Sequence, residues 1–185
     1  MSKYKRILII GSAGSGKTYL SSILSKKLNI EVTHLDKIYW LPNWEKQPVT
    51  FCEDLTKELV IPNEWIFDGN YIQTLDIRLE KADLVIFLKV NRFKCIASLF
   101  KRKRLAKRNE IERDDLADGC VDKLDFSFLK WAFTFNNDYA PKLLEVIHKY
   151  PNVDLKVFKE RHSKSVVPKK DLASHKGKIF LGIDA

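Results

Sequence analysis

The amino-acid sequence predicts an α/β fold in which five parallel strands form a sheet with helices on both faces. Two observations predict this class. Short apolar runs alternate with segments of helical periodicity from residue 6 to residue 158, which is the order typical of parallel sheets. A glycine-rich loop joins the first apolar run to the first helical segment, as in a phosphate-binding strand–loop–helix unit.

The first unit occupies residues 6–28. Residues 6–10 form a β-branched apolar run typical of a strand buried on both faces. Apolar residues then recur at helical spacing after the loop, at Leu20, Ile23, Leu24 and Leu28.

Four more strands are predicted, at residues 30–35, 65–68, 82–88 and 154–158. A helix opened by a capping box at Thr50 is expected to bury Phe51, and a short helix after Thr74 is expected to expose Arg78. Longer helices are predicted from Asn91, with Phe93 and Phe100 in the apolar stripe, over residues 126–135, buried between neighbours, and over residues 141–149.

The glycine-rich loop has the spacing of a phosphate-binding loop, and its residues are Gly11, Ser12, Ala13, Gly14, Ser15, Gly16, Lys17 and Thr18. Small residues let the backbone N–H groups curl around a chain of phosphates. Lys17 can reach the β- and γ-phosphates, and Thr18 can offer its hydroxyl to Mg²⁺. We therefore expect ATP, or another nucleoside triphosphate, and Mg²⁺ as cofactors. The alternative is a flexible glycine turn without a ligand.

Two carboxylates follow predicted strands at the edge where ligands bind in open α/β sheets. Asp68 is the candidate for holding Mg²⁺ across from Thr18. Asp36 is the candidate for orienting the second substrate and for taking its proton. Tyr39 and Trp40 follow closely, either as a wall that stacks on a planar group or as a loop pinned by its own apolar side chains.

Basic residues give the chain a formal net charge of +9, which favours polyanionic partners. One dense block contains Arg102, Arg104 and Arg108, which could contact phosphates or form a solvated or nucleic-acid-binding face. A second block covers residues 156–178. Within it Arg161 follows the fifth strand and is a candidate for packing against the base of the nucleotide.

Length and composition fit one domain over residues 1–175, with a lid region at about residues 101–125, of which residues 109–125 form a mobile excursion. Residues 176–185 form either a stray strand or a tail. No apolar run approaches a membrane span, no signal region opens the chain, and three widely spaced cysteines suggest reduced thiols. We expect a cytoplasmic protein without a membrane partner, and the sequence leaves its oligomeric state open. The four histidines match no zinc spacing.

A family resemblance rests on the glycine loop, on His34-Leu35-Asp36 and on Asp68-Gly69-Asn70-Tyr71. With these motifs the chain resembles the adenylate-kinase-like branch of the P-loop NTPases, and within it the FlaR-type "DNA topology modulation" proteins. The resemblance implies a three-layer fold with strand order 2-3-1-4-5 and a basic helical lid. It also implies that the loop holds the donor, that Asp68 organises Mg²⁺, and that Gly69 and Asn70 lie at the substrate.

One departure from the family pattern concerns the acceptor. Nucleoside monophosphate kinases usually continue Asp-Gly with Phe-Pro-Arg, where the arginine grips the acceptor phosphate, whereas Asn70-Tyr71-Ile72 stands here. Arg78 could substitute for the missing arginine. The departure puts a monophosphate acceptor in doubt.

The leading functional hypothesis is an ATP-dependent small-molecule kinase with an unidentified acceptor. Lys17, Asp36, Arg104 and Arg108 would be its catalytic residues, with Arg102 and Arg161 on the nucleotide. The alternative is a nucleotide-switched regulator that binds DNA through its basic surface. No nucleic-acid-binding motif is visible in the sequence, so this alternative ranks second.

Overall fold

A five-stranded sheet forms the centre of the computed structural model, which describes residues 3–108, 110, 115–120 and 124–160. All pairings in this sheet are parallel. Its strands are β1 (Arg6–Gly11), β2 (Val32–His34), β5 (Trp65–Asp68), β6 (Leu84–Leu88) and β7 (Asp154–Phe158).

The strand order is β2-β5-β1-β6-β7. Counting only these strands along the chain, the order reads 2-3-1-4-5, as the family resemblance implied. The central position of β1 follows from its sequence, because every residue from Ile7 to Ile10 is apolar and inaccessible to solvent. The α/β class and the parallel sheet are therefore confirmed.

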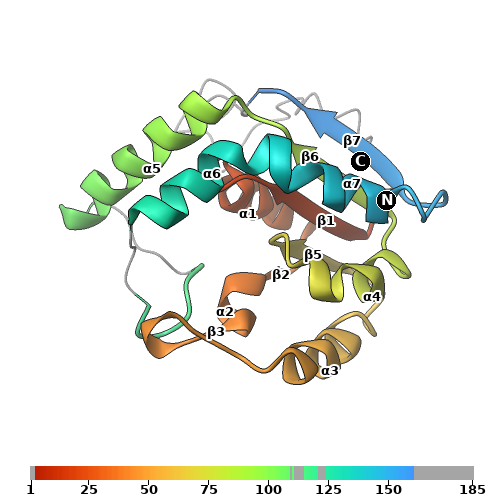
Figure 1. The fold of residues 1–185 in the computed structure, drawn as a ribbon. Coiled ribbons are helices and arrows are strands. Elements are labelled where there is room, and N and C mark those ends of the chain that lie inside the picture. Colours follow the sequence, from red (N-terminus) through yellow and green to blue (C-terminus); the bar gives the residue numbers. More distant parts are fainter. Residues whose placement is uncertain (1–2, 109, 111–114, 121–123, 161–185) are drawn as a thin grey trace.

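Helices cover both faces of the sheet (Figure 1). They are α1 (Lys17–Leu28), α2 (Leu35–Tyr39), α3 (Val49–Leu59), α4 (Leu75–Leu79), α5 (Arg92–Lys107), α6 (Phe126–Asp138) and α7 (Ala140–Ile147). A two-stranded antiparallel hairpin joins α2 to α3, with β3 (Trp40–Leu41) and β4 (Glu45–Lys46) on either side of a 3-10 turn at Pro42–Trp44. A second 3-10 turn, Ile72–Thr74, precedes α4.

The core consists of two apolar layers, one on each side of the sheet. Alternate residues of β1 serve the two layers, since Leu8 and Ile10 pack with α2, α3, α4, α6 and α7, whereas Ile7 and Ile9 pack with α1 and α5. This period of two is the geometry of a strand buried on both faces, and it gives the molecule three layers.

Three local predictions were wrong in detail. The second strand ends at His34, so Asp36 lies in the first turn of α2 and not at a strand end. Helix α3 begins at Val49 without a side-chain cap, and Phe51 is exposed because Cys52 and Thr56 form the buried face.

The inward faces of two later helices also differ from the prediction. In α5, Phe93 and Phe100 are exposed, because the residues one turn apart that face the core are Cys95 and Leu99. Helix α6 was expected to be buried between neighbours, but Phe126 is 83 % exposed. Within the described residues, no helix combines the length and apolarity needed to cross a bilayer.

Candidate functional site

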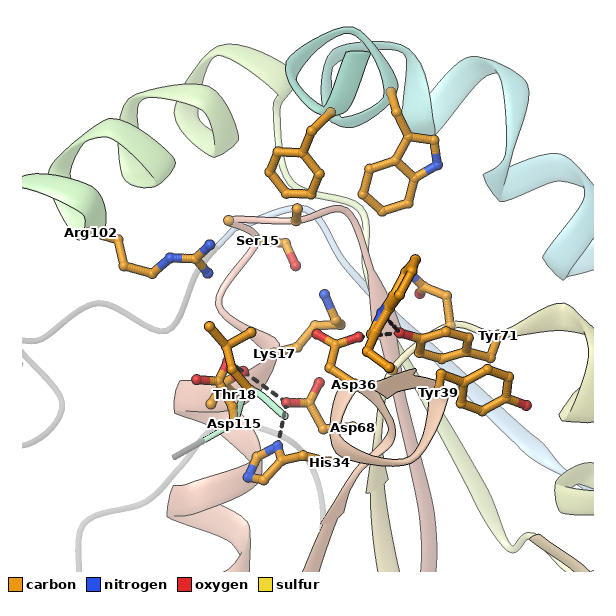
Figure 2. A pocket seen from close by; sticks show the side chains of 18 of the residues that line it. Ser15, Lys17, Thr18, His34, Asp36, Tyr39, Asp68, Tyr71, Arg102 and Asp115 are labelled. Atoms are coloured by element: carbon orange, nitrogen blue, oxygen red, sulfur yellow. Dashed lines mark hydrogen bonds and ion pairs between the residues drawn. The ribbon is translucent and has the colours of Figure 1, made fainter. Parts of the chain in front are cut away.

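A cavity of about 1300 Å³ opens at the carboxyl ends of β1 and β5, where the glycine loop lies. Single-ligand pockets usually measure about 300–1,000 Å³, so this one has room for two small molecules side by side. Figure 2 shows Lys17 and Asp36 near its middle, with Arg102 to one side and Tyr71 to the other. The site thus contains cationic, acidic and aromatic regions.

The glycine loop is held in its curl by close contacts with α5 and α6. Gly14 has a φ of 73°, and a Cβ added there would lie 2.4 Å from the carbonyl oxygen of Cys95 in α5. The Ser12 hydroxyl donates to the carbonyl of Ala132 in α6 at 2.9 Å. Only a residue without a side chain fits between the loop and α5.

Polar atoms of the loop are oriented as an anion site requires. Helix α1 starts at Lys17, so its positive end points at the cavity. The Lys17 Nζ donates to the Ser12 carbonyl at 3.2 Å. The Ser15 hydroxyl is buried and has no hydrogen-bond partner among the described residues. A bound phosphate would offer acceptors to both groups.

Thr18, Asp68, His34 and Asp115 form a cluster beside the loop (Figure 2). The Thr18 hydroxyl donates to Oδ2 of Asp68 at 2.8 Å and lies 3.4 Å from Oδ2 of Asp115. His34 Nδ1 lies 3.1 Å from the same oxygen of Asp68. A hydroxyl with one or two carboxylates is the oxygen-rich donor set that suits Mg²⁺, which keeps several waters and phosphate oxygens as its other ligands. The residues present fit that ion.

Asp36 is held by a second hydrogen-bonded group. The Tyr71 hydroxyl donates to Oδ1 of Asp36 at 2.5 Å and accepts from Nε1 of Trp40 at 2.7 Å. Burial raises the pKa of Asp36, and the Tyr71 hydrogen bond and the charge of Lys17 oppose that rise. Burial and the neighbouring Asp36 raise the pKa of Tyr71, so its phenol stays protonated as a donor. A carboxylate with a raised pKa is suited to accept a proton.

The segment between β5 and the turn before α4 connects this group to the glycine loop. The Asn70 side chain accepts from the Gly11 N–H at 2.9 Å and donates to the Gly11 carbonyl at 3.0 Å. Tyr71 follows with a φ of 28°, a strained value for a residue with a side chain. The side chain of Asn70 therefore contacts the glycine loop, and the side chain of the next residue, Tyr71, contacts Asp36.

Arg78 stabilises that strained segment through hydrogen bonds to its backbone. Its guanidinium is fully buried and donates to the carbonyls of Gly69, Asn70, Tyr71 and Thr74 at 2.7–3.4 Å. Burial lowers the pKa of Arg78 to about 10, which still leaves it charged at neutral pH. The prediction that Arg78 is exposed was wrong, because its side chain is fully buried, donates to four backbone carbonyls and does not line the cavity.

Most of the other predicted site residues do meet in the cavity. The lining includes Ala13, Gly14, Ser15, Gly16, Lys17, Thr18, Asp36, Tyr39, Trp40, Asp68, Gly69, Asn70 and Arg102. Arg104 and Arg108 are exposed and do not line it, because α5 turns them away from the glycine loop, and Arg108 lies 3.6 Å from Glu110. Arg161 and residues 176–185 lie outside the described part of the chain.

Several lining residues were not predicted to belong to the site. His34 was treated as an ordinary histidine, although its place just before Asp36 at the end of a strand could have indicated it. Asp115 and the α6 residues Phe128 and Trp131 also line the cavity. No local signal marks Asp115, because its position depends on how residues far along the chain fold back over the loop.

The sheet and the glycine loop define this chain as an α/β protein of the P-loop class. It matches no protein-family model. The chain is similar to a curated protein, "Uncharacterized protein YqaC" of Bacillus subtilis (strain 168), with 29 % identity over 153 residues, 82 % of this chain and 84 % of that protein. The resemblance to the FlaR-type group stays a prediction.

Two solved kinase structures are also similar. One is deoxyadenosine kinase from M. mycoides with bound dATP, at 15 % identity and a TM-score of 0.46, over 84 % of this chain and 91 % of that chain. The other is shikimate kinase from Bacteroides thetaiotaomicron, at 16 % identity and a TM-score of 0.48, over 84 % of this chain and 85 % of that chain.

Proposed function

We propose that this protein is a phosphotransferase that moves the γ-phosphoryl group of ATP to a small hydroxyl-bearing acceptor. The observation that carries the proposal is one cavity that contains both a phosphate-binding loop and a separate carboxylate, Asp36, fixed by Tyr71. Nucleotide binding alone would need the loop but not a second, oriented base, and the dependence of turnover on an acceptor separates transfer from hydrolysis.

The donor would bind over the glycine loop. Backbone N–H groups at the start of α1 and the Ser15 hydroxyl would hold the phosphates, and Lys17 would offset charge on the β- and γ-oxygens. Lys101 and Arg102 line the same side of the cavity from α5 and would add positive charge. In this proposal Arg102 takes the role that the sequence assigned to Arg104 and Arg108.

Thr18 and Asp68 would hold Mg²⁺, with Asp115 beside them. The ion supplies charge neutralisation for the transferred group when it is bound. The hydrogen bond between Asp68 and His34 fixes the direction of the carboxylate, which is a positioning role.

Asp36 would act on the acceptor. The carboxylate takes the proton of the attacking hydroxyl as a bond forms between that oxygen and the γ-phosphorus. The bond from the γ-phosphorus to the bridging oxygen breaks, and its electron pair leaves with ADP. Tyr71 holds Oδ1 of Asp36, so the carboxylate keeps one orientation throughout.

The test is ADP release by the purified protein with MgATP and a panel of hydroxylated acceptors. We expect turnover that depends on one acceptor and falls by at least about 10³-fold in Lys17→Ala and about 10²-fold in Asp36→Asn. Lys37→Ala removes an exposed lysine beside Asp36 that does not line the cavity, and it serves as the matched control. Equal turnover with and without every acceptor, unchanged in Asp36→Asn, would refute the proposal.

A further inference from the structure

We propose that the acceptor is an uncharged nucleoside-like molecule, a planar ring joined to a group with a free hydroxyl, and that the matching monophosphate is rejected. This inference rests on the proposed phosphotransferase function. It concerns the acceptor half of the cavity, defined here as the lining residues of α2, the β3–β4 hairpin and its exit, and the 70–73 segment. They are Asp36, Tyr39, Trp40, Trp44, Lys46, Gln47, Val49, Asn70, Tyr71 and Gln73.

The charges of this half do not suit a phosphate. Asp36 is its one carboxylate and Lys46 its one cation in the described part of the chain. Lys46 is exposed at the edge of the hairpin, whereas Asp36 lies within the site. The other cations of the described lining, Lys17, Lys101 and Arg102, belong to the glycine loop and α5, where the donor would bind.

The arginine that could have gripped an acceptor phosphate is committed elsewhere. Arg78 comes from the element next to this half, but its guanidinium is completely buried and donates to four backbone carbonyls. Those bonds hold the strained backbone of Tyr71, so the guanidinium cannot swing into the cavity without releasing Tyr71 from Asp36. A phosphate placed here would meet the Asp36 carboxylate, and the cation whose charge reaches Asp36 is Lys17, which the proposed donor phosphates would occupy.

Aromatic rings give the acceptor half its apolar surface. Tyr39 and Tyr71 stack with their centroids 3.7 Å apart, and Trp40 meets Trp44 edge to face at 5.5 Å. From α6, Phe128 and Trp131 also line the cavity, and Trp131 is 36 % exposed. Rings that are fixed by each other and still border the cavity favour a planar ligand. Gln47 and Gln73 offer amide groups for hydrogen bonds at a ring edge.

The test compares adenosine, guanosine, cytidine and thymidine, each with its 5′-monophosphate. Calorimetric binding is measured with the donor half filled by Mg²⁺ and a non-hydrolysable ATP analogue, and ADP release is measured with MgATP. We expect at least one nucleoside to bind and to be phosphorylated, and its monophosphate to bind more weakly by on the order of 10²-fold.

Substitution of Asp36 should lower the phosphorylation of the nucleoside and raise the affinity for the monophosphate. In Asp36→Asn, nucleoside phosphorylation should be lost because the base is gone, whereas monophosphate binding should tighten by at least about tenfold because the repelling charge is gone. Trp44→Ala should weaken nucleoside binding, with Phe126→Ala, an exposed aromatic outside the lining, as the control. A merely structural effect of Asp36→Asn would weaken both ligands.

Two outcomes would overturn the inference. One is phosphorylation of a monophosphate in preference to its nucleoside, above all if Lys46→Ala abolishes that monophosphate phosphorylation. The other is failure of every nucleoside to bind. If the ATP analogue binds and a monophosphate is the acceptor, the phosphotransferase proposal stands and only the inference fails. If the ATP analogue does not bind, the proposed function itself fails.

Discussion

Asp36 and Tyr71 form the most informative pair of residues in the site, because their hydrogen bond predicts a pH dependence. The pKa of Asp36 is raised by burial and lowered by Tyr71, so the proposed base would become active as the pH rises through its raised pKa. Tyr71→Phe removes the opposing hydrogen bond and keeps the ring. We expect the acidic limb of the pH–rate profile to move to higher pH.

The profile should be measured as ADP release under saturating acceptor. Trp40→Phe removes the hydrogen bond to the Tyr71 oxygen but leaves the bond to Asp36, so it should shift the limb less. A limb that moves to lower pH in Tyr71→Phe would contradict the assignment of Asp36 as the base.

Arg78 is a second residue whose environment predicts a measurable effect. Arg78→Met would fit the buried space but leave the carbonyls of Gly69, Asn70 and Tyr71 without their donor. We expect a loss of more than about 2 kcal/mol in the free energy of unfolding, measured in urea. Arg92→Met, a change at an exposed arginine, should have a small effect. Equal losses in the two variants would show that the hydrogen bonds from Arg78 to the backbone carbonyls contribute no stability.

At the scale of elements, the contact between the glycine loop and α5 predicts a difference between two glycines. Both Gly14 and Gly16 have positive φ, at 73° and 100°, so alanine is strained at either position. At Gly14 a Cβ also collides with the Cys95 carbonyl of α5, whereas at Gly16 no atom lies within 4 Å. The difference in stability between Gly14→Ala and Gly16→Ala therefore measures the contribution of packing between the glycine loop and α5.

We expect Gly16→Ala to cost about 1–3 kcal/mol from backbone strain alone. Gly14→Ala should cost more in thermal unfolding, because α5 must move away from the loop. That movement should also weaken ATP binding, since α5 carries Lys101 and Arg102 into the cavity. The prediction fails if Gly14→Ala is the more stable variant.

At the scale of the whole molecule, Asp83 connects the start of β6 to the start of the neighbouring strand β1, at the edge of the sheet opposite the site. Its carboxylate accepts from the backbone N–H groups of Lys5 and Arg6 and from the Arg6 guanidinium. Burial alone would raise the pKa of Asp83, but these hydrogen bonds outweigh it and hold the pKa below the ordinary value.

A lowered folded-state pKa means that the stabilisation is present above the unfolded pKa of about 3.9 and is lost as the pH falls through the folded value. Asp83→Asn should therefore lower the free energy of unfolding by about 1–2 kcal/mol at pH 7, and the difference from the original protein should shrink below pH 4. Urea titrations at pH 7 and at pH 3 measure this. A difference that grows at low pH would contradict the role of Asp83.

The sequence by itself determined the parts of this protein that depend on local chemistry. The run of β1 predicts a strand buried on both faces because every residue from Ile7 to Ile10 is apolar. The spacing of the glycine loop predicts an anion site, since it serves a backbone geometry that few other residues allow. Asp68 could be placed beside Thr18 because parallel strands end at one edge of a sheet.

Only the tertiary structure decided the contacts between segments distant in the sequence. A helix of period 3.6 does not reveal which arginine of α5 faces the loop, so Arg102 could not be separated from Arg104 and Arg108. The sequence predicts Arg78 as a surface residue, whereas in the structure it is buried against the backbone carbonyls of residues 69–71. The bond from Tyr71 to Asp36 spans 35 positions, and no local pattern encodes a contact created by chain reversal between strands.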